Sequence, residues 1–257
     1  MVIKELKNLL SFLTIFPVAM DKDMLTDCAK GMWAFPLIGA FIGLLAGVFG
    51  WVAYQFVPGI VVGGLVLAVL LLITGLHHTD GLLDFGDGVM AHGTPEHKID
   101  VMHDQLTGAG GLSMGIMTML ISALAIGQVT GNGQFEIPLI IGGITAVEAS
   151  AKLSMVVMGW AGKSVRQGMN SPFLEAMRGS KGDLRLIVAF VLCFAVTLPL
   201  LRWAGAFVVL AGVITSLVMV VVAHRHFKGV TGDVFGATNE ITRMICLIVL
   251  LAVVTWA

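Results

Sequence analysis

The chain has 257 residues, of which 57% are hydrophobic and only 12% charged, and its mean hydropathy is +0.96. Soluble globular domains typically carry about 25% charged residues, so this composition excludes an ordinary soluble domain and indicates an integral membrane protein. The net charge of -1 lacks the basic excess that binding to a phosphate backbone needs, which excludes a nucleic-acid-binding protein.

The first segment, residues 1–20, places Lys4 and Lys7 among apolar side chains and ends near Pro17. This pattern is typical of an amphipathic helix that lies along the membrane interface. A helix that crosses a bilayer needs roughly 20 mostly apolar residues. About seven such runs follow, near residues 31–56, 59–77, 110–130, 137–160, 185–201, 204–223 and 241–257. We therefore predict an all-α, polytopic membrane protein with a single domain.

Lysine and arginine are unevenly distributed between the two ends of these spans. If the seven spans alternate in direction, only Arg202 lies on the far side and Lys152 lies inside the fourth span, which leaves 13 of the 15 basic residues on the side of the N-terminus. Loops on the cytoplasmic side carry the excess of basic residues. We therefore predict a multi-pass protein of the cytoplasmic (inner) membrane whose active site faces the cytoplasm.

The segment HTDGLLDFGDG, residues 78–88, follows the second apolar run directly. If it continues that run as a helix, Asp80, Asp84 and Asp87 fall at positions i, i+4 and i+7 and share one face. Three carboxylates this close repel one another unless a cation lies between them. Because Mg²⁺ prefers carboxylate oxygens and is usually bound by one or two carboxylates plus substrate phosphates, we predict a Mg²⁺ site on this face.

The loop after residue 88 adds a fourth carboxylate, Asp104, which we expect to complete the acidic site from the neighbouring helix. Gly108 opens the stretch GAGG, where a phosphate could approach the backbone closely. Histidines at positions 77, 78, 92, 97 and 103 raise zinc as an alternative, but their spacings match no zinc framework.

The fourth span contains two charged residues, Glu148 and Lys152, which are four residues apart and so share a helix face. They could form a buried ion pair that fixes helix packing. Alternatively, Lys152 could lie near enough to the cytoplasmic end to reach an anionic substrate.

A second polar segment, GVTGDVFGATNEITR at residues 229–243, precedes the last predicted span. Asp233 and Glu240 would share a face in a helix, and the predicted topology puts them on the same side as the first cluster, so the two could converge. Basic residues between 163 and 185 could bind a phosphate or could act only as topology determinants.

Carboxylates suited to Mg²⁺, nearby cations and a membrane scaffold together favour phosphoryl or nucleotidyl-type transfer, with a carboxylate or histidine deprotonating an attacking hydroxyl. One alternative is an enzyme like the CDP-alcohol phosphotransferases, but no Ala-Arg pair of their signature follows Asp80 and Gly81. The other is a divalent-cation transporter, which the one-sided clustering of polar groups disfavours.

Three ordered motifs give the chain a specific resemblance to a known family. HxDGxxDxxDG begins at His78, MxDxxxGAxG begins at Met102, and TGDxxGAxxE runs from Thr231 to Glu240. FLTxFPV at residues 12–18 and RQGM at residues 166–169 also fit. Over nearly its full length the chain resembles the cobalamin-5′-phosphate synthase family, also called adenosylcobinamide-GDP ribazoletransferase.

The resemblance implies assembly of the nucleotide loop of vitamin B12, in which adenosylcobinamide-GDP is joined to α-ribazole or its 5′-phosphate and GMP is released. Mg²⁺ is the implied cofactor, and the implied metal ligands are Asp80, Asp84, Asp87 and Asp104. The implied catalytic residues are His78, Asp84, Asp233 and Glu240. The expected substrate-binding residues are Lys152, Lys163, Arg166, Gly108 and Gly232. The lipid bilayer is the other expected partner, and self-association into a homo-oligomer is left open.

Overall fold

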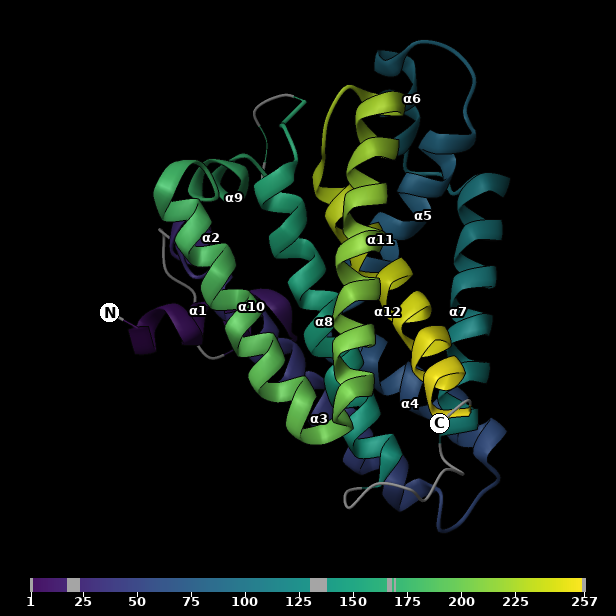
Figure 1. The fold of residues 1–257 in the computed structure, drawn as a ribbon. Coiled ribbons are helices and arrows are strands. Elements are labelled where there is room, and N and C mark those ends of the chain that lie inside the picture. The colour runs from purple at the N-terminus through teal and green to yellow at the C-terminus, as the bar shows by residue number, and fades with distance from the viewer. Residues whose placement is uncertain (1, 18–23, 130–137, 166–167, 169, 256–257) are drawn as a thin grey trace.

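The computed structural model describes residues 2–17, 24–129, 138–165, 168 and 170–255. In these ranges long helices run beside one another, and the short helices α6 (Pro95–Met102) and α9 (Ser171–Ala176) lie towards one end (Figure 1). The described residues contain no β-strand and only an isolated bridge between Ser164 and Val230. The all-α prediction is therefore confirmed.

Six described helices are long and apolar enough to cross a membrane. They are α3 (Phe35–Ala53) with its leading 3₁₀ turn η1 (Met32–Ala34), α7 (Ala109–Val129), α8 (Leu139–Ala161), α10 (Gly179–Leu201), α11 (Trp203–Phe227) and α12 (Gly232–Thr255). A seventh span results if α4 (Gly59–Ile73) and α5 (His77–Met90) are counted together. The chain is a multi-pass membrane protein, as predicted.

The last span begins nine residues earlier than the predicted boundary at residue 241. Helix α12 starts at Gly232, where the hydroxyl of Thr231 accepts a hydrogen bond from the backbone N–H of Val234, 3.4 Å away. A threonine placed before three residues with free N–H groups is a common helix start. The polar segment expected ahead of the span is therefore its first part, and Asp233 and Glu240 both lie on α12.

Residues 78–88 are helical, but they do not continue the second span in a straight line. Helices α4 and α5 meet at an angle of 97°. At the break, Gly75 has a φ of 65° and Leu76 a φ of 63°, a left-handed conformation that cannot propagate a right-handed helix. This bend separates the apolar α4 from the acidic α5.

Helix α8 is the centre of the bundle, and nearly all of its residues are buried. Helix α3 packs on it closely because glycines face it. A Cβ atom at Gly43 would lie 2.6 Å from the carbonyl oxygen of Ile144. Small residues of this kind let membrane helices approach each other and gain van der Waals contact.

The N-terminal segment forms α1 (Val2–Leu13), and residues 18–20 of the predicted segment lie outside the described residues. Leu9 and Leu13 are buried, whereas Lys4 and Lys7 are exposed. The expected amphipathic helix is therefore present. It is tied to α2 (Met24–Lys30) by the amide of Asn8, which donates to the Asp27 carboxylate 3.2 Å away.

Candidate active site

Helix α5 carries the three aspartates of the first motif on one face. Asp80 is exposed, while Asp84 and Asp87 are half-buried. Asp84 lies within electrostatic reach of Asp80, Asp87 and Asp233 on α12. The carboxylates of α5 and α12 thus form one cluster of like charge, which we call the acidic face and define as Asp80, Asp84 and Asp233.

Asp233 reaches the acidic face because α5 and α12 pack with almost no separation. A Cβ atom at Gly81 would lie 2.9 Å from both the Cα and the carbonyl oxygen of Asp233. A Cβ atom at Gly236 would lie 3.1 Å from the Cα of His78. Side chains larger than glycine would push the two helices apart. The structure therefore brings together the two polar segments that the predicted topology placed on one side.

A histidine from the loop after α6 joins the acidic face. His103 Nε2 lies 3.7 Å from Asp233 Oδ2. Helix α6 is held beside α11, where Lys98 Nζ lies 3.0 Å from His226 Nδ1. The sequence marked His103 only as one of several loop histidines, because no spacing rule connects it with a residue 130 positions later.

Asp87 has a well-defined structural contact. Its carboxylate accepts hydrogen bonds from the backbone N–H groups of Gly108 (2.7 Å) and Gly111 (2.8 Å). These N–H groups begin α7, where a helix leaves its first donors without partners and favours negative charge. Asp87 therefore caps α7, and Gly108 serves that cap. A role for either residue in binding metal or substrate stays a prediction.

Asp104 does not lie on a helix, contrary to the expectation that it would approach the site from the neighbouring helix. It is exposed in the loop between α6 and α7, and its carboxylate accepts a hydrogen bond from the N–H of Leu106, 3.3 Å away. Aspartate commonly bonds to backbone two residues onward, which favours a turn over a helix. Its part in a metal site stays a prediction.

The acidic face has the donor chemistry of a shared Mg²⁺ site. Within the described ranges no three His, Cys, Asp or Glu side chains converge closely enough to hold a metal ion by themselves. Mg²⁺ usually keeps several waters and takes one or two carboxylates, with substrate phosphates completing its shell. The oxygen donors of Asp80, Asp84 and Asp233 fit such a shared site, and they do not form a closed protein cage.

His78 lies behind the acidic face. Its side chain is buried, and its Nδ1 atom has no hydrogen-bond partner among the residues that the structure describes. Lys152 and Arg243 lie close enough to act on it electrostatically. A buried polar atom without a partner is costly, so this imidazole nitrogen is available to a group that is absent from the structure, such as water or substrate.

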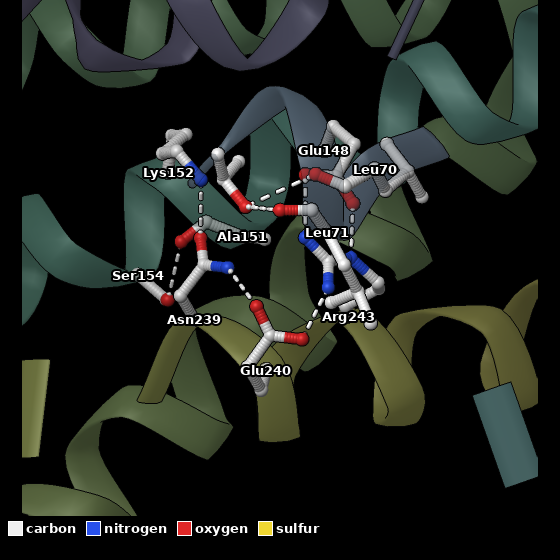
Figure 2. A network of polar contacts seen from close by, with 10 residues as sticks. Leu70, Leu71, Glu148, Ala151, Lys152, Ser154, Asn239, Glu240 and Arg243 are labelled. Carbon is white, nitrogen blue, oxygen red and sulfur yellow. Dashed lines mark hydrogen bonds and ion pairs between the residues drawn. The ribbon is translucent and has the colours of Figure 1, made fainter. Parts of the chain in front are cut away.

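Glu240, predicted to act beside Asp233, is buried seven residues further along α12. Its carboxylate accepts from the Arg243 guanidinium and from Asn239 Nδ2, 3.0 Å away (Figure 2). Arg243 also pairs with Glu148 of α8 through two of its nitrogens. The described bonds of Glu240 thus belong to a buried network, and its predicted catalytic role remains a prediction.

Lys152 belongs to the same network. It is buried, and its Nζ donates to the side-chain oxygen of Asn239, 2.6 Å away (Figure 2). Of the two alternatives for Glu148 and Lys152, the structure favours a packing role, but the ion pair that it records joins Glu148 to Arg243. We call Glu148, Lys152, Asn239, Glu240 and Arg243 the buried network.

Two further expected substrate contacts, Lys163 and Gly232, lie just after α8 and at the start of α12. Lys163 is exposed, its backbone N–H donates to His224 Nε2 (3.1 Å), and its carbonyl oxygen accepts from Val230 (2.7 Å). Gly232 is exposed at the start of α12. Arg166 lies outside the described residues.

The chain matches the model of the cobalamin-5-phosphate synthase family over residues 5–251. It is 32% identical to an adenosylcobinamide-GDP ribazoletransferase of Methanosarcina barkeri, across 95% of this chain and 90% of that protein. Relatives of the same name from Methanococcoides burtonii (30% identity, 97% and 92% coverage) and Methanocella arvoryzae (32% identity, 96% and 95% coverage) are similar to it. No solved structure matches the chain.

Proposed function

The chain belongs to the cobalamin-5-phosphate synthase family, and from this premise we propose that it joins adenosylcobinamide-GDP to α-ribazole or to α-ribazole 5′-phosphate and releases GMP. The name of its relatives supports the two substrates. The single observation that carries the proposal is the close packing of α5 on α12 at Gly81 and Asp233, which brings Asp233 within electrostatic reach of Asp84. Carboxylates gathered in this way can hold a metal ion, and a transfer at a diphosphate needs positive charge against its oxygens.

The reaction exchanges one bond to phosphorus for another. A ribose hydroxyl of the ribazole attacks the phosphorus attached to the cobinamide arm, the bond from that phosphorus to the bridging oxygen breaks, and GMP leaves with the bridging oxygen. When the acceptor is the 5′-phosphate, that phosphate is retained, so the attacking oxygen is a hydroxyl of the ribose ring. The hydroxyl proton passes to a base, for which the acidic face and His78 supply the groups.

Asp80, Asp84 and Asp233 would hold Mg²⁺ in this proposal. The metal would supply positive charge that neutralises the diphosphate oxygens and the charge that develops on the leaving GMP. Without it, three carboxylates would repel an anionic substrate. The protein residues orient the diphosphate, and the closely packed α5 and α12 hold their carboxylates at fixed separation. Asp104 is a further proposed ligand. For Asp87, whose carboxylate already bonds to two backbone N–H groups, we propose the capping role at α7 in place of the predicted metal contact.

We place the acidic face on the cytoplasmic side of the inner membrane. Support comes from the excess of lysine and arginine on the side of the N-terminus. Arg243 no longer counts toward this excess, because it lies inside α12. Lys163, Arg166 and Gly232 are proposed to contact the nucleotide or the ribazole. Lys152, which is buried, would act on the substrate only from a distance.

The test is a reconstituted assay. Purified protein in lipid nanodiscs receives adenosylcobinamide-GDP, α-ribazole and Mg²⁺, and GMP and the corrinoid product are measured. We expect stoichiometric formation of both, and their loss when Mg²⁺ is chelated. If the wild-type protein released no GMP with either acceptor and instead carried Mg²⁺ into liposomes, the transporter alternative would replace this proposal.

A further inference from the structure

The buried network places four ionisable side chains inside two membrane spans. Glu148 and Lys152 lie on α8, Glu240 and Arg243 lie on α12, and all four are buried. Two carboxylates face two cations, so the formal charges balance. Ionisable groups within membrane spans are costly and commonly mark functional sites, yet each of these side chains is at most 1% exposed.

The network joins the two helices at two points. Arg243 on α12 pairs with Glu148 on α8 through Nε and Nη2 while its Nη1 binds Glu240 (Figure 2). One turn before Arg243 on α12, the side-chain oxygen Oδ1 of Asn239 accepts a hydrogen bond from Lys152 Nζ on α8, 2.6 Å away. A guanidinium that binds a carboxylate through two nitrogens is directional. The two links together restrict the rotation of α12 about its own axis and also its sliding along α8.

The same helix presents Asp233 to the acidic face. Glu240 lies seven residues beyond Asp233, which corresponds to about 10 Å along a helix. Between them, Gly236 packs against the backbone of His78, and Asp233 itself packs against Gly81. Contacts this close leave no room to absorb a rotation of α12. A turn or slide of α12 would therefore move the Asp233 carboxylate relative to Asp84.

We infer that the buried network is a positioning device for the acidic face: it fixes α12 against α8 so that Asp233 stands beside Asp84, and none of its members contacts the reacting atoms. This inference rests on the proposed function for its catalytic consequence. The positional consequence can be measured without substrate or metal.

If the buried network only stabilised the fold, a variant that keeps the stability would also keep the position of α12. Buried ion pairs can often be replaced by apolar side chains of similar size without loss of stability, whereas removal of one partner leaves an unpaired charge. The informative variant is therefore the double substitution Glu240→Gln with Arg243→Met. It removes one charge of each sign and leaves Glu148 and Lys152 to balance each other on α8. The matched control is Leu247→Ala, which truncates a buried apolar side chain one turn further along α12.

The first readout is the position of α12. Nitroxide labels go on Met90→Cys, at the exposed end of α5, and Gly232→Cys, where a Cβ atom would meet no described residue of another element within 4 Å. The native thiols are buried, and burial, aided by the neighbouring Asp27, raises the pKa of the Cys28 thiol to about 12, so they label slowly at neutral pH. Electron–electron double resonance should show a shifted or broadened distance in the double variant and an unchanged distance in Leu247→Ala.

The second readout is kinetic, in the same variants without the label cysteines. Per folded molecule, the double variant should lose about tenfold to 100-fold in kcat, the size expected for misplaced catalytic groups, with KM for α-ribazole unchanged. Leu247→Ala should keep the wild-type kcat. An unchanged distance in the double variant overturns the inference, and so does an unchanged kcat despite a moved helix. If the wild type showed no turnover, the proposed function would fail, while the distance measurement would still decide the positional claim.

Discussion

Helix α12 carries two carboxylates seven residues apart, and their surroundings are opposite. Asp233 is half-buried beside Asp80 and Asp84, which have the same charge, with His103 3.7 Å away. Glu240 is buried and bound to the cation Arg243 and the amide of Asn239. A cluster of like charges can be stabilised by an arriving cation, whereas a balanced network gains nothing from one. We therefore propose that the acidic face carries the chemistry and that the buried network sets the position of α12.

The largest expected effect is a loss of activity without a loss of stability when the acidic face is changed. Asp84→Asn keeps the shape of the side chain but removes its charge, and we expect kcat to fall by at least about 100-fold, as when a group that stabilises transition-state charge is lost. The thermal unfolding midpoint should not fall. Asp100→Asn, an exposed carboxylate on α6, is the control and should keep wild-type kcat. Full activity in Asp84→Asn would remove the acidic face from the catalytic site.

In the buried network, by contrast, we expect a substitution to lower the stability of the protein. Arg243→Met alone leaves the buried carboxylates of Glu148 and Glu240 with Lys152 as the one cation of the buried network, and this unbalanced charge should cost about 3–5 kcal/mol of stability. The yield of folded protein and its unfolding midpoint in detergent should both fall sharply. The same substitution at the exposed Arg225 should change neither. Equal stability of the two variants would show that the network does not hold α12.

Gly81 is the point where α5 packs against α12 beside Asp233. A methyl group at Gly81 would collide with the Asp233 backbone, so Gly81→Ala should cost about 1–3 kcal/mol through overpacking and should also lower kcat. Gly64→Ala on α4, where a Cβ atom would lie more than 4 Å from every described residue of the other helices, is the matched control. Loss of stability in both variants alike would point to a general effect of the substitution.

The smallest expected effect concerns Asp87, which bonds to the first N–H groups of α7. Asp87→Ala should cost about 0.5–2 kcal/mol, the range for loss of a helix cap, while the Mg²⁺ concentration for half-maximal activity stays unchanged. Chemical unfolding and a Mg²⁺ titration measure the two quantities. A large rise in the Mg²⁺ requirement would instead assign Asp87 to the metal site.

Much of this architecture could be predicted from local sequence. Apolar runs locate the membrane helices, and the spacing of Asp80, Asp84 and Asp87 correctly indicates one helical face. The bend before α5 was not predicted, because Leu76 adopts a left-handed conformation that its residue type disfavours. The hydropathy pattern also placed the start of α12 too late, because Asp233, Glu240 and Arg243 lower the hydropathy of its first turns.

The sequence also could not predict which side chains pair with one another across helices. Glu148 and Lys152 have the spacing of an ion pair, but the structure pairs Glu148 with Arg243, 95 residues away. The sequence also did not reveal that the Asp87 carboxylate accepts hydrogen bonds from the backbone N–H groups of Gly108 and Gly111. Such choices depend on which helices pack together. Glycines at the contact points decide that packing, and their partners cannot be read from spacing.

The central claim is that Asp84 on α5 and Asp233 on α12 act as one site, and a double-mutant cycle tests it most directly. kcat/KM is measured for wild type, Asp84→Asn, Asp233→Asn and the double variant in nanodiscs with saturating Mg²⁺. Residues that act as a unit give strongly non-additive losses, so we predict that the double variant is little worse than the more damaged single variant. Additive losses in the free energy of activation would contradict a shared site.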